Sequence, residues 1–258
     1  MDIGDRRLNK VRSWIGAAYR RMRRRLLKRT RILLHNHRRN WAMFTSRFDR
    51  RRSEAPIRLL HQIQRGIFSG YHFDGTPCLK NPFDLALYSK LLSELRPKTI
   101  IEIGSAEGGS GKWFAAQLKG LDIDGIVYSF DINPVTGLDG SNLKFGRADI
   151  FNLYDSDLPN ILETCDRPLL VVEDGPHTFD GCLSSLDFFK DYLDKDEYYV
   201  VEDGNLMELG HYEMENGPKR AVEKFLKNNS RFEIDYSYCD FYGRNVTWNH
   251  NGWLRVTE

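Results

Sequence analysis

The five residues VVEDG occur twice in this chain, at positions 171–175 and 200–204. Each copy is an apolar run that ends in two acids, and the first copy continues as PHTFDG, which places a histidine three residues after Asp174. Carboxylates bind divalent cations, and histidine gains and loses protons near neutral pH. The two acidic ends are therefore the first candidates for chemistry, provided that the fold brings them together.

The spacing of the copies favours a strand–helix–strand unit, because nothing between them repeats as in a tandem array. Neighbouring parallel strands lie about 4.8 Å apart, and their carboxyl ends share one edge of the sheet. Asp174, Glu202 and Asp203 would then offer an all-oxygen site that suits Mg²⁺, since such acids repel one another without a cation. His177 would be the general base beside that ion. The alternative is that these residues only cap or pack the segments after them.

A second stretch with chemical potential is EIGSAEGGS, at residues 102–110. Its small residues let the backbone approach a ligand, and the helix start that comes next attracts negative charge. The stretch does not fit the GxGxxG dinucleotide fingerprint, and it lacks the GK[ST] ending of a Walker A loop. An acid followed by Gly-Ser-x-x-Gly-Gly is typical of S-adenosylmethionine binding, and a plain tight turn is the alternative. The candidate cofactor-binding residues here are Glu102, Gly104, Ser105, Gly108 and Ser110.

Acids also come after the next two predicted strands. Asp131 ends the run VYSFD, where a carboxylate can accept hydrogen bonds from both ribose hydroxyls of a nucleoside. Asp149 lies in GRADIFN, where an acid can contact the adenine amine. Each acid alone could be a solvated loop residue, but acids at three consecutive strand ends favour a nucleoside site.

Apolar strands that alternate with helices predict an α/β fold with a mostly parallel, Rossmann-like sheet covered on both faces. We expect strands at residues 99–103, 126–130, 143–146, 168–172 and 198–201. We expect helices within 81–97, with Asn81 as its cap, and at 109–118, 178–193 and 219–227. The C-terminal segments RFEIDYSYC and GWLRVTE predict an antiparallel pair of strands.

The charge is divided unevenly along the chain, although the net charge is only +2. Residues 1–52 hold 18 lysines and arginines against three acids, and the remainder carries a net charge of −13. We therefore divide the chain into a basic arm, residues 1–55, and a body, residues 56–258. Apolar residues recur at helical spacing in the arm, which predicts a basic amphipathic helix: Leu8, Val11, Ile15, Ala18, Met22 and Leu26.

Such an arm is typical of proteins that bind an anionic membrane surface. A solvated helix or tail is an equal alternative, and nucleic acid is a less favoured partner. The four cysteines are scattered without a CxxC pair, which argues against a disulfide framework and suits a reducing compartment. We therefore expect a cytoplasmic protein whose arm can lie on the inner face of a membrane. A homo-oligomer stays open.

From residue 71 onward the chain resembles the cephalosporin hydroxylase/macrocin O-methyltransferase family, which uses S-adenosylmethionine and Mg²⁺. The resemblance rests on KNPFDLALY, IIEIGSAEGGSGKWFA, SFDINP, EDGPHTFDGCLSSL, YYVVEDGNL and NVTWNHNGWLR, in the expected order. It implies a class I methyltransferase fold in which Asp174, Glu202 and Asp203 hold the metal and His177 is the base. The cofactor pocket would be lined by Glu102, Gly104, Ser105, Asp131 and Asp149.

The predicted function is therefore a Mg²⁺-dependent O-methyltransferase that acts on a sugar or another polyhydroxylated acceptor. Hydroxylase chemistry is not expected, because no facial triad of two histidines and a carboxylate is recognisable. One rival is an RNA-directed methyltransferase that uses the basic arm, although the body is acidic and no [DN]PP[FY] motif is present. The other rival is a non-catalytic, membrane-associated module that binds the nucleoside.

Overall fold

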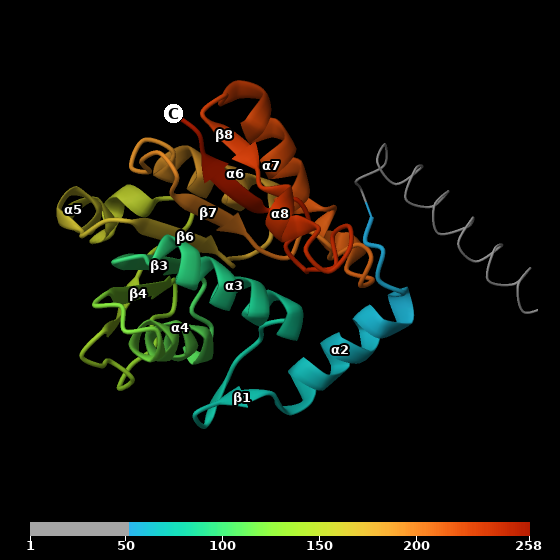
Figure 1. The fold of residues 1–258 in the computed structure, drawn as a ribbon, viewed down its shortest axis with the longest axis horizontal. Coiled ribbons are helices and arrows are strands. Elements are labelled where there is room, and N and C mark those ends of the chain that lie inside the picture. The colour runs from blue at the N-terminus through green and yellow to red at the C-terminus, as the bar shows by residue number, and fades with distance from the viewer. Residues whose placement is uncertain (1–51) are drawn as a thin grey trace, which may run out of the picture. The chain divides into compact units, whose positions relative to one another are not determined.

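Seven strands form one sheet, and each contains an apolar run that the sequence predicts as a strand. The structure is a computed structural model that describes residues 52–258. The strand order is β5-β4-β3-β6-β7-β9-β8, in which β3 to β7 run parallel and the last two are antiparallel, as predicted (Figure 1). The strands are β3 (Thr99–Ile103), β4 (Ile126–Asp131), β5 (Leu143–Arg147), β6 (Leu169–Glu173), β7 (Tyr198–Val201), β8 (Phe232–Ile234) and β9 (Trp253–Val256).

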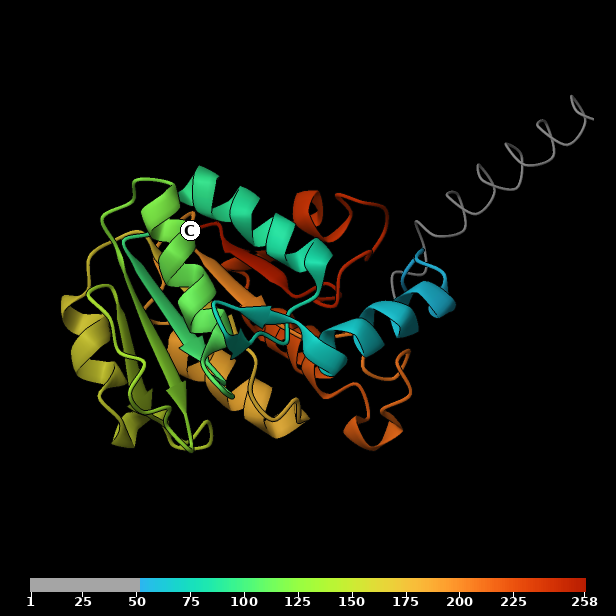
Figure 2. The ribbon, with the colours of Figure 1, turned by 90° about the horizontal axis from the view of Figure 1, so that it is seen from below.

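Helices cover both faces of this sheet, and each face has its own hydrophobic core. One core packs α5 (Leu158–Thr164), α6 (Phe179–Phe189) and α7 (Gly217–Asn228) against the sheet. The other core packs α3 (Pro82–Leu95), α4 (Gly109–Gly120) and α8 (Tyr236–Cys239). Figure 2 shows α3 and α4 on one side of the strands and α6 on the other. Two short 3-10 turns, η1 (Leu153–Asp155) and η2 (Tyr212–Met214), lie in the connections.

The ends of the predicted helices agree with their capping residues. Asn81 caps α3 by accepting a hydrogen bond from the Phe83 backbone N–H at 3.0 Å, as predicted. The prediction of a helix over 178–193 was too long by one residue at the start and four at the end, because α6 begins after its cap Thr178 and ends at Phe189. The Arg231 guanidinium binds the carbonyl oxygens of Lys190 and Leu193, which provides partners for the chain where the helix stops.

Part of one predicted strand is a helix instead. RFEIDYSYC forms β8 only as far as Ile234, because the Asp235 side chain accepts a hydrogen bond from the Ser237 backbone N–H and so caps the four-residue helix α8. Tyr238 of that helix stacks on Trp253 of β9 with ring centroids 5.2 Å apart. The aromatic side chains of the segment therefore cover the sheet instead of extending it.

The segment before α3 forms elements that the sequence analysis did not predict. These are α2 (Ile57–Gly70) and a hairpin of β1 (His72–Phe73) and β2 (Thr76–Pro77). Asp74 and Gly75 turn the hairpin with positive φ angles of 46° and 75°, which is the conformation that favours an Asp-Gly pair in a tight turn. On α2 only Leu60 and Ile67 are buried, and they pack with Leu209 and Trp248, so its apolar stripe is narrow. The predicted amphipathic helix of the arm lies outside the described residues.

A buried carboxylate connects α3 to the segment that precedes β9. Asp84, which is 1% exposed, accepts a hydrogen bond from the Trp248 backbone N–H at 2.9 Å and another from the Thr247 hydroxyl. The residues of the NVTWNHNGW motif are largely buried at this junction. Asp84 therefore fixes the C-terminal segment to the helix that begins beside the sheet edge.

We predict that Asp84→Ala lowers the free energy of unfolding by about 2–4 kcal/mol, because two buried donors lose their acceptor. Asp84→Asn should cost less, since it keeps one acceptor oxygen. Asp187→Ala, at an exposed position on α6, should change the stability by less than about 0.5 kcal/mol. Urea unfolding of the three variants measures these differences. Equal stability of Asp84→Ala and Asp187→Ala would show that the junction does not need this carboxylate.

Candidate functional site

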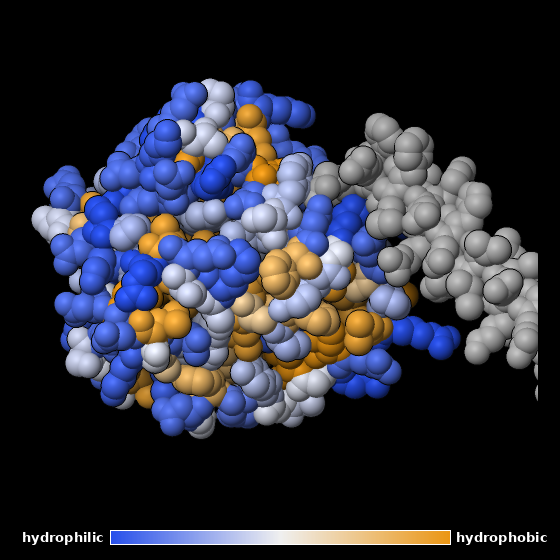
Figure 3. Space-filling view, in the orientation of Figure 1, coloured by the Kyte–Doolittle hydropathy of each residue, from blue (hydrophilic) through white to orange (hydrophobic). Residues whose placement is uncertain are grey.

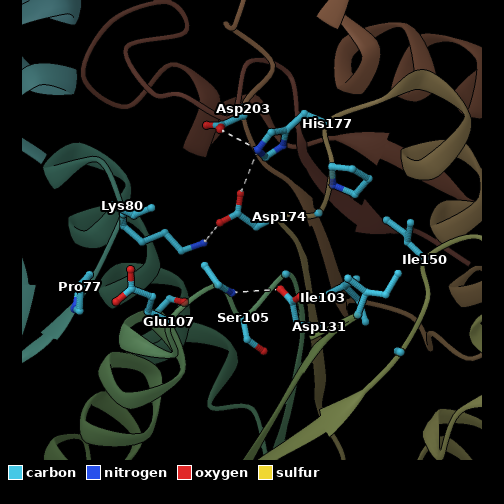
Figure 4. Close-up of a pocket in the computed structure, with 18 of the residues that line it drawn as sticks. Pro77, Lys80, Ile103, Ser105, Glu107, Asp131, Ile150, Asp174, His177 and Asp203 are labelled. Carbon is cyan, nitrogen blue, oxygen red and sulfur yellow. Dashed lines mark hydrogen bonds and ion pairs between the residues drawn. The ribbon is translucent and has the colours of Figure 1, made fainter. Parts of the chain in front are cut away.

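A cavity of about 550 Å³ opens at the carboxyl ends of the parallel strands. Its wall comes from the turns after β3, β4, β5, β6 and β7, and from the segment between α2 and α3 (Figure 4). The residues predicted to bind the cofactor or the metal that line it are Gly104, Ser105, Ser110, Asp131, Asp149, Asp174, His177 and Asp203. The fold thus brings eight of the eleven predicted site residues to one cavity.

The other three predicted residues lie behind the wall of this cavity. Gly108 is the N-cap of α4 with a φ of 87°, and a side chain there would meet the Phe145 ring at 2.9 Å. Glu102 and Glu202 are 0% and 3% exposed, and neither lines the cavity. Their carboxylates are therefore placed to support the site from within the protein.

The turn after β3 needs glycine because two strand ends meet there. A Cβ atom on Gly104 would lie 1.9 Å from the carbonyl oxygen of Asp174, and the φ of 102° is itself unfavourable for other residues. The Gly104 N–H donates to the Phe130 carbonyl at 2.7 Å, and the Ala106 N–H donates to Asp131 Oδ2 at 3.1 Å. The turn is thus held between β4 and β6.

Asp131 and Asp149 are both oriented by the backbone. Asp131 Oδ1 accepts from the Asn133 N–H at 3.0 Å, and Asp149 Oδ1 accepts from the Phe151 N–H at 3.0 Å. A carboxylate has about four lone-pair positions, so each retains acceptor capacity for a ligand. This end of the cavity can therefore receive hydroxyl and amine donors.

At the other end of the cavity, Asp174, His177 and Asp203 form a compact group. His177 Nε2 is 3.4 Å from Asp203 Oδ2 and 4.0 Å from Asp174 Oδ1. One ligand atom from each of the three lies within 4.8 Å of the others, which makes them the candidate metal group among residues 52–258. Asp174 and Asp203 come just after the adjacent strands β6 and β7, as the two VVEDG copies predict.

The backbone of this group is strained, because His177 and Asp203 have positive φ angles of 56° and 59°. Non-glycine residues in this region cost about 1–3 kcal/mol each and are common where a side chain has to be held for a function. Nine other non-glycine residues among residues 52–258 also have a positive φ, so this conformation alone assigns no role to either residue.

Burial and mutual repulsion shape the protonation of this group. Burial raises the pKa of Asp174 to about 6, and the Lys80 ammonium opposes that rise. Burial also raises the pKa of Asp203. Burial alone would lower the pKa of His177, but the Asp203 and Asp174 carboxylates outweigh it and raise that pKa. The two carboxylates and the imidazole therefore influence one another's protonation within one buried group.

Glu202, predicted as a third carboxylate ligand, is not part of the group of Asp174, His177 and Asp203. Its Oε1 atom accepts a hydrogen bond from Lys80 Nζ at 2.6 Å and another from the Tyr88 hydroxyl at 2.7 Å. Lys80 and Tyr88 belong to the motif KNPFDLALY, to which the sequence analysis assigned no chemical role. A lysine that directly precedes an Asn-Pro helix start gives no sign, in the sequence alone, of a carboxylate partner more than 90 residues away.

We predict that Gly104→Ala lowers the free energy of unfolding by at least about 2 kcal/mol, because the new methyl group overlaps the Asp174 carbonyl and the φ angle is unfavourable. Gly120→Ala is the matched control, since a Cβ there meets no atom within 4 Å. The control should be as stable as the parent or slightly more stable. Thermal unfolding of both variants decides the matter, and a Gly104→Ala protein as stable as its control would contradict the observed packing.

Comparison with known proteins identifies a family. The sequence model described as Rhamnosyl O-methyltransferase/CmcI matches residues 65–142 and 157–257. The rhamnosyl O-methyltransferase of Mycobacterium tuberculosis (strain ATCC 25618 / H37Rv) is 26% identical over 210 residues, which cover 76% of this chain and 82% of that protein. That of Mycobacterium leprae (strain TN) is 30% identical over 175 residues, which cover 64% of this chain and 72% of that protein.

Solved structures agree with the sequence matches. A structure of CmcI with Mg and SAM has a TM-score of 0.58 and 25% identity, covering 74% of this chain and 78% of that one. A structure of CmcI with SAH has a TM-score of 0.55 and 22% identity, covering 73% and 83%, and supports the fold alone. The predicted fold and enzyme class are confirmed, and the chain belongs to the rhamnosyl O-methyltransferase/CmcI family.

Proposed function

We propose that this chain transfers the methyl group of S-adenosylmethionine to a hydroxyl of a sugar, with the help of Mg²⁺. The observation that carries the proposal is a single cavity with two chemically different ends. Asp131 and Asp149 form an acceptor surface that suits a nucleoside. Asp174, His177 and Asp203 form an acidic surface that suits the activation of a hydroxyl. Membership of an O-methyltransferase family supports the assignment of both ends to one reaction.

The nucleoside end fits S-adenosylmethionine, which would supply the methyl group from its sulfonium sulfur. We assign Asp131 to the ribose hydroxyls and Asp149 to the adenine amine, because each is an oriented acceptor at the end of a strand. Gly104 lines this cavity, and its lack of a side chain lets the turn after β3 lie against the Asp174 backbone. Similarity to the CmcI structure that contains Mg and SAM supports S-adenosylmethionine as the nucleoside that this cavity binds.

The acidic end fits a divalent cation, which would bind two neighbouring acceptor hydroxyls and lower the pKa of one. Asp174 and Asp203 offer carboxylate oxygens, the kind of ligand that Mg²⁺ prefers. Glu202 stays a predicted ligand whose carboxylate contacts Lys80 and Tyr88 in this structure. The His177 imidazole lies close enough to Asp174 and Asp203 to serve either as a base or as a further ligand of the cation. We assign it as the base because Mg²⁺, a hard cation, favours oxygen ligands.

We assign the His177 imidazole to take the proton of the acceptor hydroxyl. The imidazole lines the cavity, and the Asp203 carboxylate, whose Oδ2 lies 3.4 Å from Nε2, would stabilise the imidazolium that forms. His177 has a backbone φ of 56°, and α6 begins two residues later. Both features fix the position of the backbone atoms from which the imidazole extends. Because both reactants are held beside this ring, positioning contributes much of the expected rate.

The mouth of the cavity favours an acceptor that also has an apolar part. Phe68 and Leu79 line the cavity while remaining 63% and 39% exposed. A separate groove of about 500 Å³ between α2 and α3 is lined by Ile63, Ile67 and Leu85, among others, and it shares Lys80 with the cavity. Figure 3 shows apolar residues gathered over this region. We therefore propose a glycoside whose sugar enters the cavity and whose apolar group lies against Phe68.

The proposed partners of the arm stay predictions. Residues 1–51 lie outside the described part of the chain, so neither an anionic membrane surface nor nucleic acid as their target is tested. Within residues 52–258, no helix is both long and apolar enough to cross a bilayer. A sugar attached to a lipid would account both for a basic arm and for an apolar mouth of the cavity. For this reason we favour a membrane surface over nucleic acid as the target of the arm.

We predict methyl transfer from labelled S-adenosylmethionine to simple glycosides in Mg²⁺, and none in EDTA. His177→Ala should lower kcat by about 10²–10⁴, with partial rescue at high pH where hydroxide can take the proton. His61→Ala, an exposed histidine of α2, is the control and should leave kcat unchanged. Full activity in EDTA would remove the cation from the proposal. Binding of S-adenosylmethionine without transfer to any hydroxylated acceptor would remove the acceptor class.

For the apolar mouth, we predict that Phe68→Ala raises KM about tenfold for a sugar with a long alkyl group and leaves KM for the methyl glycoside unchanged. The reason is that burying a phenylalanine side chain contributes about 1.5–3 kcal/mol when it is complete. Tyr154→Ala is the control, because this exposed aromatic ring lies on η1 outside the cavity. Equal KM changes for both acceptors would place the apolar group elsewhere.

A further inference from the structure

Lys80 is a buried cation surrounded by carboxylates. Its side chain is 2% exposed, and Nζ lies 2.6 Å from Asp174 Oδ2, 2.6 Å from Glu202 Oε1 and 3.8 Å from Glu102 Oε1. In Figure 4 the side chain extends from the segment before α3 toward Asp174. The three acids come from the ends of three adjacent strands, β3, β6 and β7. One ammonium group therefore joins three strand ends.

Lys80 contacts the carboxylates of Asp174 and Glu202, whereas His177 lies near those of Asp174 and Asp203. Asp174 is shared, since Oδ2 faces Lys80 while Oδ1 faces His177 at 4.0 Å. Glu202 Oε1 is held from two directions, by Lys80 and by the Tyr88 hydroxyl. An added divalent cation at Asp174 would therefore bind within a few ångströms of a fixed positive charge.

The charges explain why a fixed cation is needed. Glu102, Asp174, Glu202 and Asp203 bring four carboxylates to this edge, and Lys80 is the lysine that pairs with three of them. Buried carboxylates that lie close together are costly unless cations and hydrogen bonds compensate them. Lys80 donates hydrogen bonds to Asp174 Oδ2 and Glu202 Oε1, each at 2.6 Å, and so compensates part of this buried negative charge.

We propose that Lys80 is a resident cation which holds Asp174 and Glu202 in place in the metal-free protein and, by competing for the same carboxylates, weakens the binding of the divalent cation. The inference rests on the cation site of the proposed function. Lys80 is a positioning residue in this account, because it acts on the acids and does not contact the reacting atoms. The protein thereby keeps an ordered site before the cation arrives, at the cost of affinity for it.

Titration of the full chain with Mn²⁺, followed by the electron paramagnetic resonance signal of the free ion, tests the competition. Lys80→Met and Lys80→Gln should bind Mn²⁺ at least about tenfold more tightly than the parent, because a positive charge a few ångströms from the ion is removed. Lys90→Met is the control, since Lys90 lies on α3 and pairs with the exposed Glu94 at 2.7 Å. Its Mn²⁺ affinity should stay within about twofold of the parent.

Thermal unfolding gives a second readout that does not depend on activity. Lys80→Met should melt below the parent in EDTA, and saturating Mn²⁺ should close most of that gap, because the ion replaces the missing charge. The double variant Lys80→Met/Glu202→Gln has the net charge of the parent and should recover stability in EDTA. If the single variants do not fold, the double variant decides, since failure of this variant to fold would show that the role of Lys80 is not one of charge.

The two proposals fail in distinguishable ways. Unchanged or weaker Mn²⁺ binding by both Lys80 variants, beside normal binding by the parent, overturns the competition and leaves the cation site standing. Absence of Mn²⁺ binding by the parent and by both variants overturns the cation site and the role of Lys80 together. Binding by the variants but not by the parent would support the competition in its strongest form.

Discussion

The repulsion among carboxylates at the ends of β3, β6 and β7 is the constraint on which the rest of the structure depends. Parallel strands direct their carboxyl ends to one edge, so acids that end neighbouring strands must lie close together. Their charge has to be balanced by neighbouring cations and hydrogen-bond donors. Lys80 comes from the segment before α3 and Tyr88 from the middle of α3, and Ser129 of β4 donates to Glu102 Oε2 at 2.5 Å. The position of α3 is therefore tied to the chemistry of the sheet edge.

The same edge depends on close contacts between backbones. A side chain on Gly104 would overlap the Asp174 carbonyl, and a Cβ on Gly252 would lie 2.0 Å from the carbonyl oxygen of Val201. The segment before β9 thus packs directly on the end of β7, two residues before Asp203. Asp84 holds that segment from the side of α3. Packing of this kind can maintain the unfavourable φ angles of His177 and Asp203, whose own preferences oppose them.

Sequence reasoning predicted the features that depend on periodicity and on strand ends. The apolar runs indicated the strands, and the rule that parallel strands share a carboxyl edge predicted that Asp174 and Asp203 would be neighbours. The partner of Glu202 was not predictable, because whether its carboxylate contacts a metal ion or Lys80 depends on where α3 packs. The sequence reasoning also missed α2, whose buried stripe has two residues, and the hairpin, although the Asp-Gly pair is a usable signal. The roles assigned to the site residues stay predictions.

The turn after β3 and the acid that follows β6 contact each other through the backbone, and this bears on how the proposed methyl transfer could be organised. Ile103 of β3 pairs with Glu173 of β6, and the residues next in the chain, Gly104 and Asp174, meet through their backbones. Gly104 and Asp174 are therefore separated by about one strand spacing, about 4.8 Å. Hydrogen bonds in the sheet, such as that from the Asp174 N–H to the Ile103 carbonyl, set their relative position. A reaction whose rate depends on aligning two reactants gains most from such a fixed separation.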